Sequence, residues 1–295
     1  MEAEPLESSP PAPGARPGTF AARVARRTAA SPRWWAVVGS RLVRLGELLR
    51  RSRLDATREA EAALAGSPAL AARMVLDGPF RGMRYPAPRA FGSMLYPKLV
   101  GSYECELHPW LEQLRRRPYA HVMDIGCAEG YYAVGLALLW PAAQVHAHDS
   151  DPAALDACRE TARANGVLDR LHLGGAVSAE DLGRFGALAD GLIVCDCEGC
   201  ELSLFTPPVV ERLAGCDVIV ELHDFIDPTI SSTLVERFRP SHAVHTVRTA
   251  RRHPGRFAAL RGLSPLAREL AMAEQRPGPM EWLLARSRPG ARTPG

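Results

Sequence analysis

From residue 119 onward, short apolar runs alternate with longer segments of helical length. The apolar runs have the length of buried strands, and each is followed by residues that can form a helix. Such alternation predicts an α/β fold, in which a mostly parallel sheet is covered by helices on both faces. The expected strands are 119–125, 143–148, 171–173, 191–196, 217–223, 242–249 and 280–285. The expected helices run up to 140, over 152–165, from 178, over 201–213, from 228, and within 255–276.

The first of these strands leads into a glycine turn. Residues 121–125 are apolar enough for a buried parallel strand, and Gly126 and Gly130 can adopt backbone angles that are closed to other residues. A glycine turn between a strand and a helix presents free backbone N–H groups to a ligand. The order of residues differs from the G-x-G-x-x-G of dinucleotide-binding proteins, because an acid at 124 precedes small residues at 126, 128 and 130. That carboxylate suits a positively charged ligand better than a pyrophosphate.

The run Asp124-x-Gly126-x-Ala128-x-Gly130 resembles motif I of the class I S-adenosylmethionine-dependent methyltransferases. The second strand ends at Asp149, nineteen residues past Gly130, where an acid can accept hydrogen bonds from both hydroxyls of a ribose. Residues 174–177 follow the third strand, and the resemblance implies that the adenine lies there. Since this segment has no acid, we expect backbone and apolar contacts to hold the base.

Two further strand ends carry acids. The fourth strand is followed by Asp196-x-Glu198-Gly199-x-Glu201, and the fifth ends in Glu221-x-His223. Both patterns are similar to signatures of the FkbM family of methyltransferases, as are residues 101–104 and 279–282. The resemblance covers about residues 78–286. It implies a Rossmann-like sheet of seven strands with the last one antiparallel, S-adenosylmethionine as cofactor, and O-methylation of a small hydroxylated metabolite or sugar.

The candidate site residues follow from the strand ends and from this resemblance. Methyl transfer to a hydroxyl needs a group that takes a proton. His223 is the first candidate and Asp196 the second, with Glu198 and Glu221 beside them. The expected cofactor-binding residues are Tyr103, Glu104, Asp124, Gly126, Cys127, Ala128, Glu129, Gly130, Asp149, Ser150, Ala176 and Asp196.

Two metal-dependent interpretations compete with a metal-free site. In the first, Mg²⁺ lowers the pKa of the acceptor hydroxyl and is held by Asp196, Glu221, His223 and Asp224. In the second, zinc is held by Cys195, Cys197 and Cys200. The zinc interpretation is weak because Cys195 and Cys197 share one face of the expected strand and no second C-x-x-C is present. A metal-free site is therefore the first expectation, and Mg²⁺ at Asp196 and its neighbours is the alternative that stays open.

Composition favours a bacterial cytoplasmic protein. The seven cysteines are scattered without a disulfide framework, which fits a reducing compartment. No apolar run approaches the roughly 20 residues that span a bilayer. The cations are arginines except for Lys98, and the Ala, Gly and Pro content indicates a high-GC genome. The expected partner is a small-molecule acceptor, without stable nucleic-acid binding.

Residues 1–115 are predicted to form an N-terminal arm followed by a cap. Residues 1–32 lack large apolar side chains and are expected to be a disordered arm. Residues 1–53 carry a net charge of +6, with ten Arg and four Glu, and the rest carries −3, so the arm either is solvated or touches nucleic acid or an anionic membrane. Helices are expected over 34–54 and 55–65, and a hairpin over 78–85. The first helix is expected to pack in a core or a homodimer rather than on a membrane.

The expected divisions are the arm 1–32, a helical cap region 33–115, a methyltransferase domain 116–286 and a disordered tail 287–295.

Three other functions fit parts of the sequence. A methyltransferase-shaped binding protein without turnover would keep the acids at 124 and 149. An NAD(P)-dependent dehydrogenase is disfavoured by the glycine spacing. RNA methylation would use the arginine-rich residues 1–53, but the chain offers no aromatic-rich basic platform for it.

Overall fold

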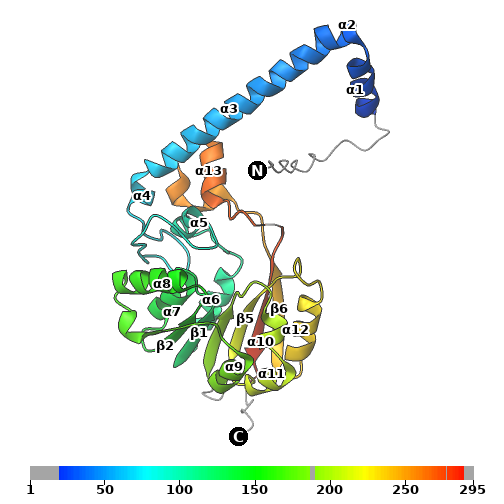
Figure 1. The fold of residues 1–295 in the computed structure, drawn as a ribbon. Helices are drawn as coiled ribbons and strands as arrows, with labels where there is room; N and C mark the ends of the chain where they lie inside the picture. Colours follow the sequence, from blue (N-terminus) through cyan, green and yellow to red (C-terminus); the bar gives the residue numbers. More distant parts are fainter. Residues whose placement is uncertain (1–19, 187–189, 277, 289–295) are drawn as a thin grey trace, which may run out of the picture. The chain divides into compact units, whose positions relative to one another are not determined.

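The computed structural model of the chain describes residues 20–186, 190–276 and 278–288 (Figure 1). The chain divides into two compact units, Met1–Glu59 and Ala60–Gly295. The second unit contains the whole sheet and all of the residues expected at the site.

A seven-stranded sheet forms the centre of the second unit, in the order β3-β2-β1-β4-β5-β7-β6. β7 runs antiparallel to β5 and β6, and the other pairs are parallel. This confirms the sheet predicted from the sequence, including the reversed last strand. The strands are β1 His121–Ile125, β2 Gln144–His148, β3 Leu171–Gly174, β4 Gly191–Cys195, β5 Asp217–Leu222, β6 His242–Arg248 and β7 Glu281–Ser287.

Helices cover both faces of the sheet because successive strand residues point to opposite sides. On one face, Val122 and Val145 pack with α7 and α8 in one buried cluster. On the other face, Met123 and Val218 pack with α9 to α12 in a second cluster. These helices are α7 Tyr131–Leu139, α8 Pro152–Ala164, α9 Ala179–Gly186, α10 Glu201–Leu204, α11 Pro207–Arg212 and α12 Ile230–Phe238.

Residues before β1 form a cap that packs on α7, one of the helices that cover the sheet. Phe80 meets Tyr131 of α7 edge to face, with ring centroids 5.0 Å apart. The expected hairpin is present as a single antiparallel bridge between Met74 and Arg84. Short helices complete this cap, namely α4 Pro68–Ala71, α5 Leu95–Val100 and α6 His108–Leu114. The 255–276 insert forms η3 Pro254–Arg256, η4 Ala258–Leu260 and α13 Pro265–Met272, and α13 packs against α5.

One expected helix of the sheet domain is broken. The helix predicted over 201–213 ends at Leu204 and restarts at Pro207. Thr206 is extended, with ψ 156°, because the ring of a following proline disfavours the helical conformation. The short α10 therefore stands directly behind the end of β4, where it carries Glu201.

The first unit is helical and differs from the expected disordered arm. Residues 1–19 lie outside the described part, but Phe20–Ala30 forms α1. The helices predicted over 34–54 and 55–65 are one helix, α3 Ser40–Ala65, since no glycine or proline interrupts residues 50–60. Between α1 and α3 lie α2 Pro32–Trp34 and the π-helical turn η1 Trp35–Gly39. Among the described residues, no helix combines the length and the apolar character that crossing a bilayer requires.

Candidate functional site

A cavity of about 480 Å³ opens at the carboxyl ends of β1, β2 and β4. Ligands of open parallel sheets bind at this edge. Phe91 and Lys98 line the cavity from the cap, and Val177 lines it from the segment after β3. The expected residues that line it are Tyr103, Gly126, Cys127, Ala128, Asp149, Ser150, Ala176, Asp196 and Glu198.

The glycine turn after β1 is held close to the neighbouring strands. Gly126 has φ +83°, and a Cβ atom built there would lie 1.7 Å from the carbonyl oxygen of Asp196. The N–H groups of Gly126 and Cys127 donate to the carbonyl of His148, at 2.8 and 2.9 Å. Only glycine fits at 126, because any side chain would collide with the end of β4.

Asp149 stands at the end of β2 and closes the turn from the other side. Its Oδ2 accepts from the N–H of Ala128 at 2.9 Å, and its Oδ1 accepts from the N–H of Asp151 at 2.9 Å. A carboxylate has about four lone-pair sites, so both oxygens retain the capacity to accept a ligand's hydroxyls. Capping of α8 belongs instead to Asp151, which accepts from Ala153 N–H at 2.8 Å. Asp149 is therefore available as the predicted hydroxyl-binding group.

Asp124 lies beneath the turn and does not line the cavity. Burial raises its pKa to about 8, although a hydrogen bond from the backbone of Ala133 lowers it. Its Oδ2 is buried without a hydrogen-bond partner among the described residues. The raised pKa means that the Asp124 carboxyl group is mostly protonated at neutral pH, and a cationic ligand in the cavity would favour its ionised form.

Three other expected cofactor residues are structural in this arrangement. Glu129 accepts from Lys98 Nζ at 2.5 Å and from the N–H of Phe91 at 2.9 Å. Gly130 is the N-cap of α7 with φ +92°, and a Cβ there would approach the sulfur of Cys158 to 2.9 Å. Glu104 pairs with Arg276. None of the three lines the cavity, so they support its wall from behind.

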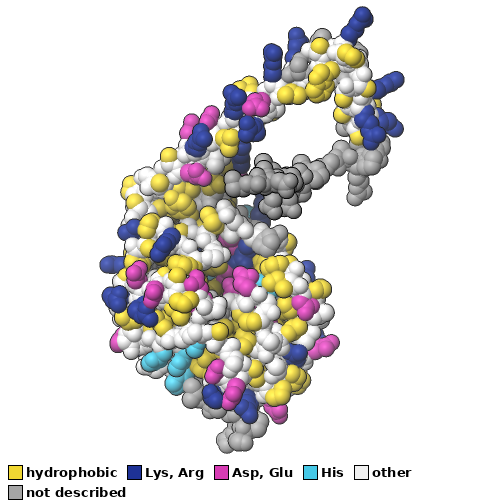
Figure 2. Space-filling model, in the orientation of Figure 1, with side chains coloured by type: hydrophobic (Ala, Val, Ile, Leu, Met, Phe, Trp, Pro, Cys, Tyr) yellow, Lys and Arg dark blue, Asp and Glu magenta, His cyan; other side chains and the backbone are white. Residues whose placement is uncertain are grey.

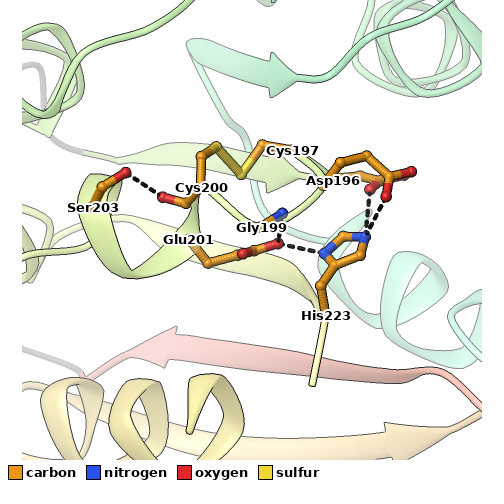
Figure 3. Close-up of a disulfide and its surroundings, with 8 residues drawn as sticks. Asp196, Cys197, Gly199, Cys200, Glu201, Ser203 and His223 are labelled. Carbon is orange, nitrogen blue, oxygen red and sulfur yellow. Dashed lines mark hydrogen bonds and ion pairs between the residues drawn. A yellow bond between two sulfur atoms is a disulfide. The ribbon is translucent and has the colours of Figure 1, made fainter. Parts of the chain in front are cut away.

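His223 follows β5 and is held by carboxylates on both ring nitrogens (Figure 3). Nδ1 is hydrogen-bonded to Glu201, whose side chain has no exposed surface. Nε2 lies 3.4 Å from oxygens of both Asp196 and Glu198, which line the cavity. Burial lowers the pKa of His223, but the Glu201 hydrogen bond and the surrounding negative charges outweigh it and raise the pKa above the ordinary value.

The carboxylates around Asp196 share one guanidinium. Arg276 forms ion pairs with Glu221 and with Glu104. Burial, together with the charges of Asp196 and Glu104, raises the pKa of Glu221 to about 10, although Arg276 acts in the opposite direction. Burial also raises the pKa of Asp196. Arg276 and the imidazole thus balance a site that is otherwise strongly acidic.

The four proposed magnesium ligands do not all converge. Asp196, Glu221 and His223 bring one ligand atom each within 4.8 Å of one another. Asp224 turns away and accepts from the N–H and hydroxyl of Ser231, at 2.9 and 2.5 Å. Arg276 engages Glu221, and Asp196 lies 3.4 Å from His223 Nε2, so each of the three groups already has a partner.

The zinc interpretation is wrong for this structure. Cys197 and Cys200 form a disulfide, and Cys195 is fully buried in β4. The disulfide also differs from the expectation that the cysteines are reduced. It closes a loop in which Glu198 and Gly199 have φ of +53° and +103°, and this loop points Glu198 toward the imidazole.

Sequence reasoning missed Lys98 and Arg276 and did not assign a role to Glu201. Arg276 lies 55 residues from Glu221 and 172 from Glu104, and no local pattern marks it. The sequence does mark Lys98, because it is the single lysine in an arginine-rich chain. The sequence also marks Glu201, since it belongs to the acidic pattern after β4.

Comparison with known proteins gives matches to the cofactor half of the domain. A family model described as Ribosomal protein L11 methyltransferase (PrmA) matches residues 107–196. The ribosomal protein L11 methyltransferase of Methylococcus capsulatus is 38% identical over 101 residues, which are 34% of this chain and 32% of that protein. The release factor glutamine methyltransferase of Deinococcus radiodurans is 43% identical over 61 residues, 21% of this chain and 22% of that one. The chain thus spans a third or less of these curated relatives.

Several solved structures that resemble this chain carry methyltransferase names. The precorrin-6y C5,15-methyltransferase of Geobacter metallireducens has a TM-score of 0.42 and 17% identity, covering 60% of this chain and 84% of its own. The O-methyltransferase of Bacillus cereus has a TM-score of 0.40 and 12% identity, covering 60% and 78%. The second unit of this chain has the Rossmann-like fold of the class I methyltransferases.

Proposed function

We propose that the protein is an S-adenosylmethionine-dependent methyltransferase that methylates a hydroxyl group of a small metabolite or sugar, as its FkbM-like motifs suggest. The cofactor is S-adenosylmethionine, and it would occupy the cavity at the ends of β1, β2 and β4. Asp149 would accept its ribose hydroxyls, and Ala176 and Val177 would contact its adenine. When bound, it supplies a methyl group on a positively charged sulfur, and that charge would favour the ionised form of Asp124 below the turn.

The observation that carries the O-methylation proposal is the Glu201–His223 pair behind Asp196. Asp196 and Glu198 line the cavity and lie 3.4 Å from His223 Nε2. His223 is buried and does not line the cavity, so an acceptor hydroxyl would reach the imidazole through these carboxylates, and Glu201 holds the ring in position through Nδ1. The proton leaves the hydroxyl toward the imidazole, and the oxygen becomes the nucleophile.

The relatives suggest protein substrates as the main alternative, with ribosomal protein L11 as the named one. The family model matches residues 107–196, so it covers the glycine turn after β1 and ends before β5 with His223. Shared cofactor binding explains those matches without a shared acceptor. RNA methylation and a binding protein without turnover are the remaining alternatives.

Calorimetry with S-adenosylhomocysteine and NADH tests the cofactor. We expect S-adenosylhomocysteine to bind and NADH not to bind; the opposite result would refute a methyltransferase.

Transfer of a labelled methyl group then identifies the acceptor among hydroxylated metabolites and sugars, ribosomal protein L11 and RNA. We expect transfer to the hydroxylated compounds, with His223→Ala reducing turnover by about 10²–10⁴-fold. His242→Ala is a matched control, because that buried histidine of β6 bonds to the backbone of Leu213 and Cys216 instead. Labelling of L11 or RNA alone would contradict the O-methylation proposal.

A further inference from the structure

The helical first unit exposes apolar side chains that a water-soluble surface normally buries. Of the twelve large apolar side chains that are exposed among the described residues, nine lie between residues 20 and 54. Leu42 and Leu49 are 60% and 61% exposed, and Trp35 is 48% exposed. We call residues 20–54 the basic arm. The other exposed apolar residues of the arm are Phe20, Val24, Val43, Leu45, Leu48 and Leu54.

The same segment concentrates positive charge. The basic arm contains nine arginines and one acid, Glu47, so its net charge is +8. The whole chain is +3, which leaves −5 on the remainder. Two of the arginines, Arg50 and Arg51, pair with Glu47. Figure 2 shows basic and apolar side chains alternating along this helical region.

The two kinds of side chain are partly separated around α3, with Arg53 on the leucine side and with Val43 and Leu54 on the arginine side. Residues three, four or seven apart lie on one face of a helix, which places Leu42, Leu45 and Leu49 together. Arg44 and Arg51 fall on the opposite side of the same turns. An apolar face with leucine and tryptophan, an arginine-rich polar face and no bilayer-spanning helix describe a helix that lies in the plane of a membrane surface.

Three partners could cover the leucine face of α3, namely a second copy of the chain, RNA and an anionic membrane. The charge and the apolar character of the arm distinguish between them. A second copy of the chain would bring another +8 against the arm, which opposes self-association. RNA would satisfy the arginines but would leave the aliphatic leucines in water, because single-stranded RNA is bound mainly by aromatic stacking and phosphate contacts. An anionic bilayer satisfies both, since its headgroups attract the arginines and its acyl boundary receives the leucines.

We infer that the basic arm is a peripheral anchor that binds membranes containing anionic phospholipid. This inference is independent of the proposed methyl transfer, because the arm contains none of the residues that line the cavity.

Co-sedimentation of the full chain with vesicles tests the inference. We expect binding to vesicles of equal parts phosphatidylcholine and phosphatidylglycerol, little binding to phosphatidylcholine alone, and release by high salt. Changing Leu42, Leu45 and Leu49 to glutamine keeps the charge and should weaken binding by more than about tenfold. Changing Arg41, Arg44 and Arg51 to glutamine should weaken it by about 10²-fold, at about fivefold for each arginine.

Leu138→Gln is the matched control, because Leu138 is exposed but lies on α7 of the other unit. It should bind vesicles as the wild type does, and circular dichroism should show that the leucine variant keeps its helices. Three results would overturn the inference of a membrane anchor. The first is equal binding to neutral and anionic vesicles, and the second is full binding by the leucine variant. The third is a wild-type protein that forms a stable dimer while the leucine variant is a monomer. RNA binding that displaces the vesicles and survives the leucine substitutions would also overturn it.

Discussion

Replacing Lys98 with methionine should destabilise the protein more than any surface ion-pair change. Lys98 Nζ lies 2.5 Å from Glu129 Oε1, and both side chains are only 3% exposed. The ammonium also lies 4.9 Å from the ring centre of Tyr103 and 5.3 Å from that of Tyr131. Methionine fills similar space but leaves Glu129 as a buried carboxylate without its counter-charge.

The expected loss follows from that uncompensated charge. Removing one partner of a buried ion pair costs about 3–5 kcal/mol of unfolding free energy. For a domain of this size, each kcal/mol lowers the melting temperature by about 2–4 °C, so Tm should fall by about 6–20 °C. The double variant Lys98→Met/Glu129→Gln should recover much of the loss, because both charges are then absent.

Urea unfolding and calorimetry of the wild type, both single variants and the double variant measure the coupling. Arg184→Met is the matched control, since Arg184 pairs with Glu180 at 2.5 Å but the two side chains are 67% and 73% exposed. Its Tm should hardly change. The reasoning fails if Lys98→Met unfolds like this control, or if the double variant is no more stable than Lys98→Met.

Further predictions concern the cavity and the loop after β4. Gly126→Val should abolish binding of S-adenosylhomocysteine in calorimetry, because a Cβ would meet the Asp196 carbonyl at 1.7 Å, whereas Asp149→Ala should weaken binding by about 1–3 kcal/mol through lost charged hydrogen bonds. Turnover should rise with pH through a pKa above the ordinary histidine value, and Glu201→Gln should move that rise to lower pH, because Glu201 raises the pKa of His223. Protonated His223 likewise stabilises the fold below about pH 6.5, and this contribution is lost as pH rises through the folded-state pKa. EDTA should not reduce turnover; EDTA sensitivity together with full activity of His223→Ala would favour a metal on Asp196. Thiol titration of the denatured chain should give five free cysteines without reductant and all seven after reduction.

The sheet could be predicted because its signals are local. Each strand is a short apolar run with an adjacent turn, and the glycine turn and Asp149 follow from backbone freedom and strand ends. The expected helix over 201–213 failed for a local reason too, since Pro207 and Pro208 should have marked its break. The two helices expected over 34–54 and 55–65 are one, because residues 50–60 contain no glycine or proline that would end a helix.

The ion pairs of the site could not be predicted in this way. Arg276 precedes β7, yet its guanidinium reaches Glu104 of the cap and Glu221 of β5. That meeting depends on β7 inserting next to β5, which only the folded topology determines. The buried position of Glu201 likewise depends on the helix break that turns α10 beneath β4.

Because Lys98 is buried and is the single lysine, its chemical modification can report on opening of the cavity. A reagent specific for ε-amino groups has one target in this sequence, and the folded protein buries it against the ring of Tyr103 at the wall of the cavity. Because Lys98 is 2% exposed and paired with Glu129, its modification requires this wall of the cavity to open. The rate of that single reaction, read by mass spectrometry, measures how often the cavity opens and how strongly each ligand keeps it closed.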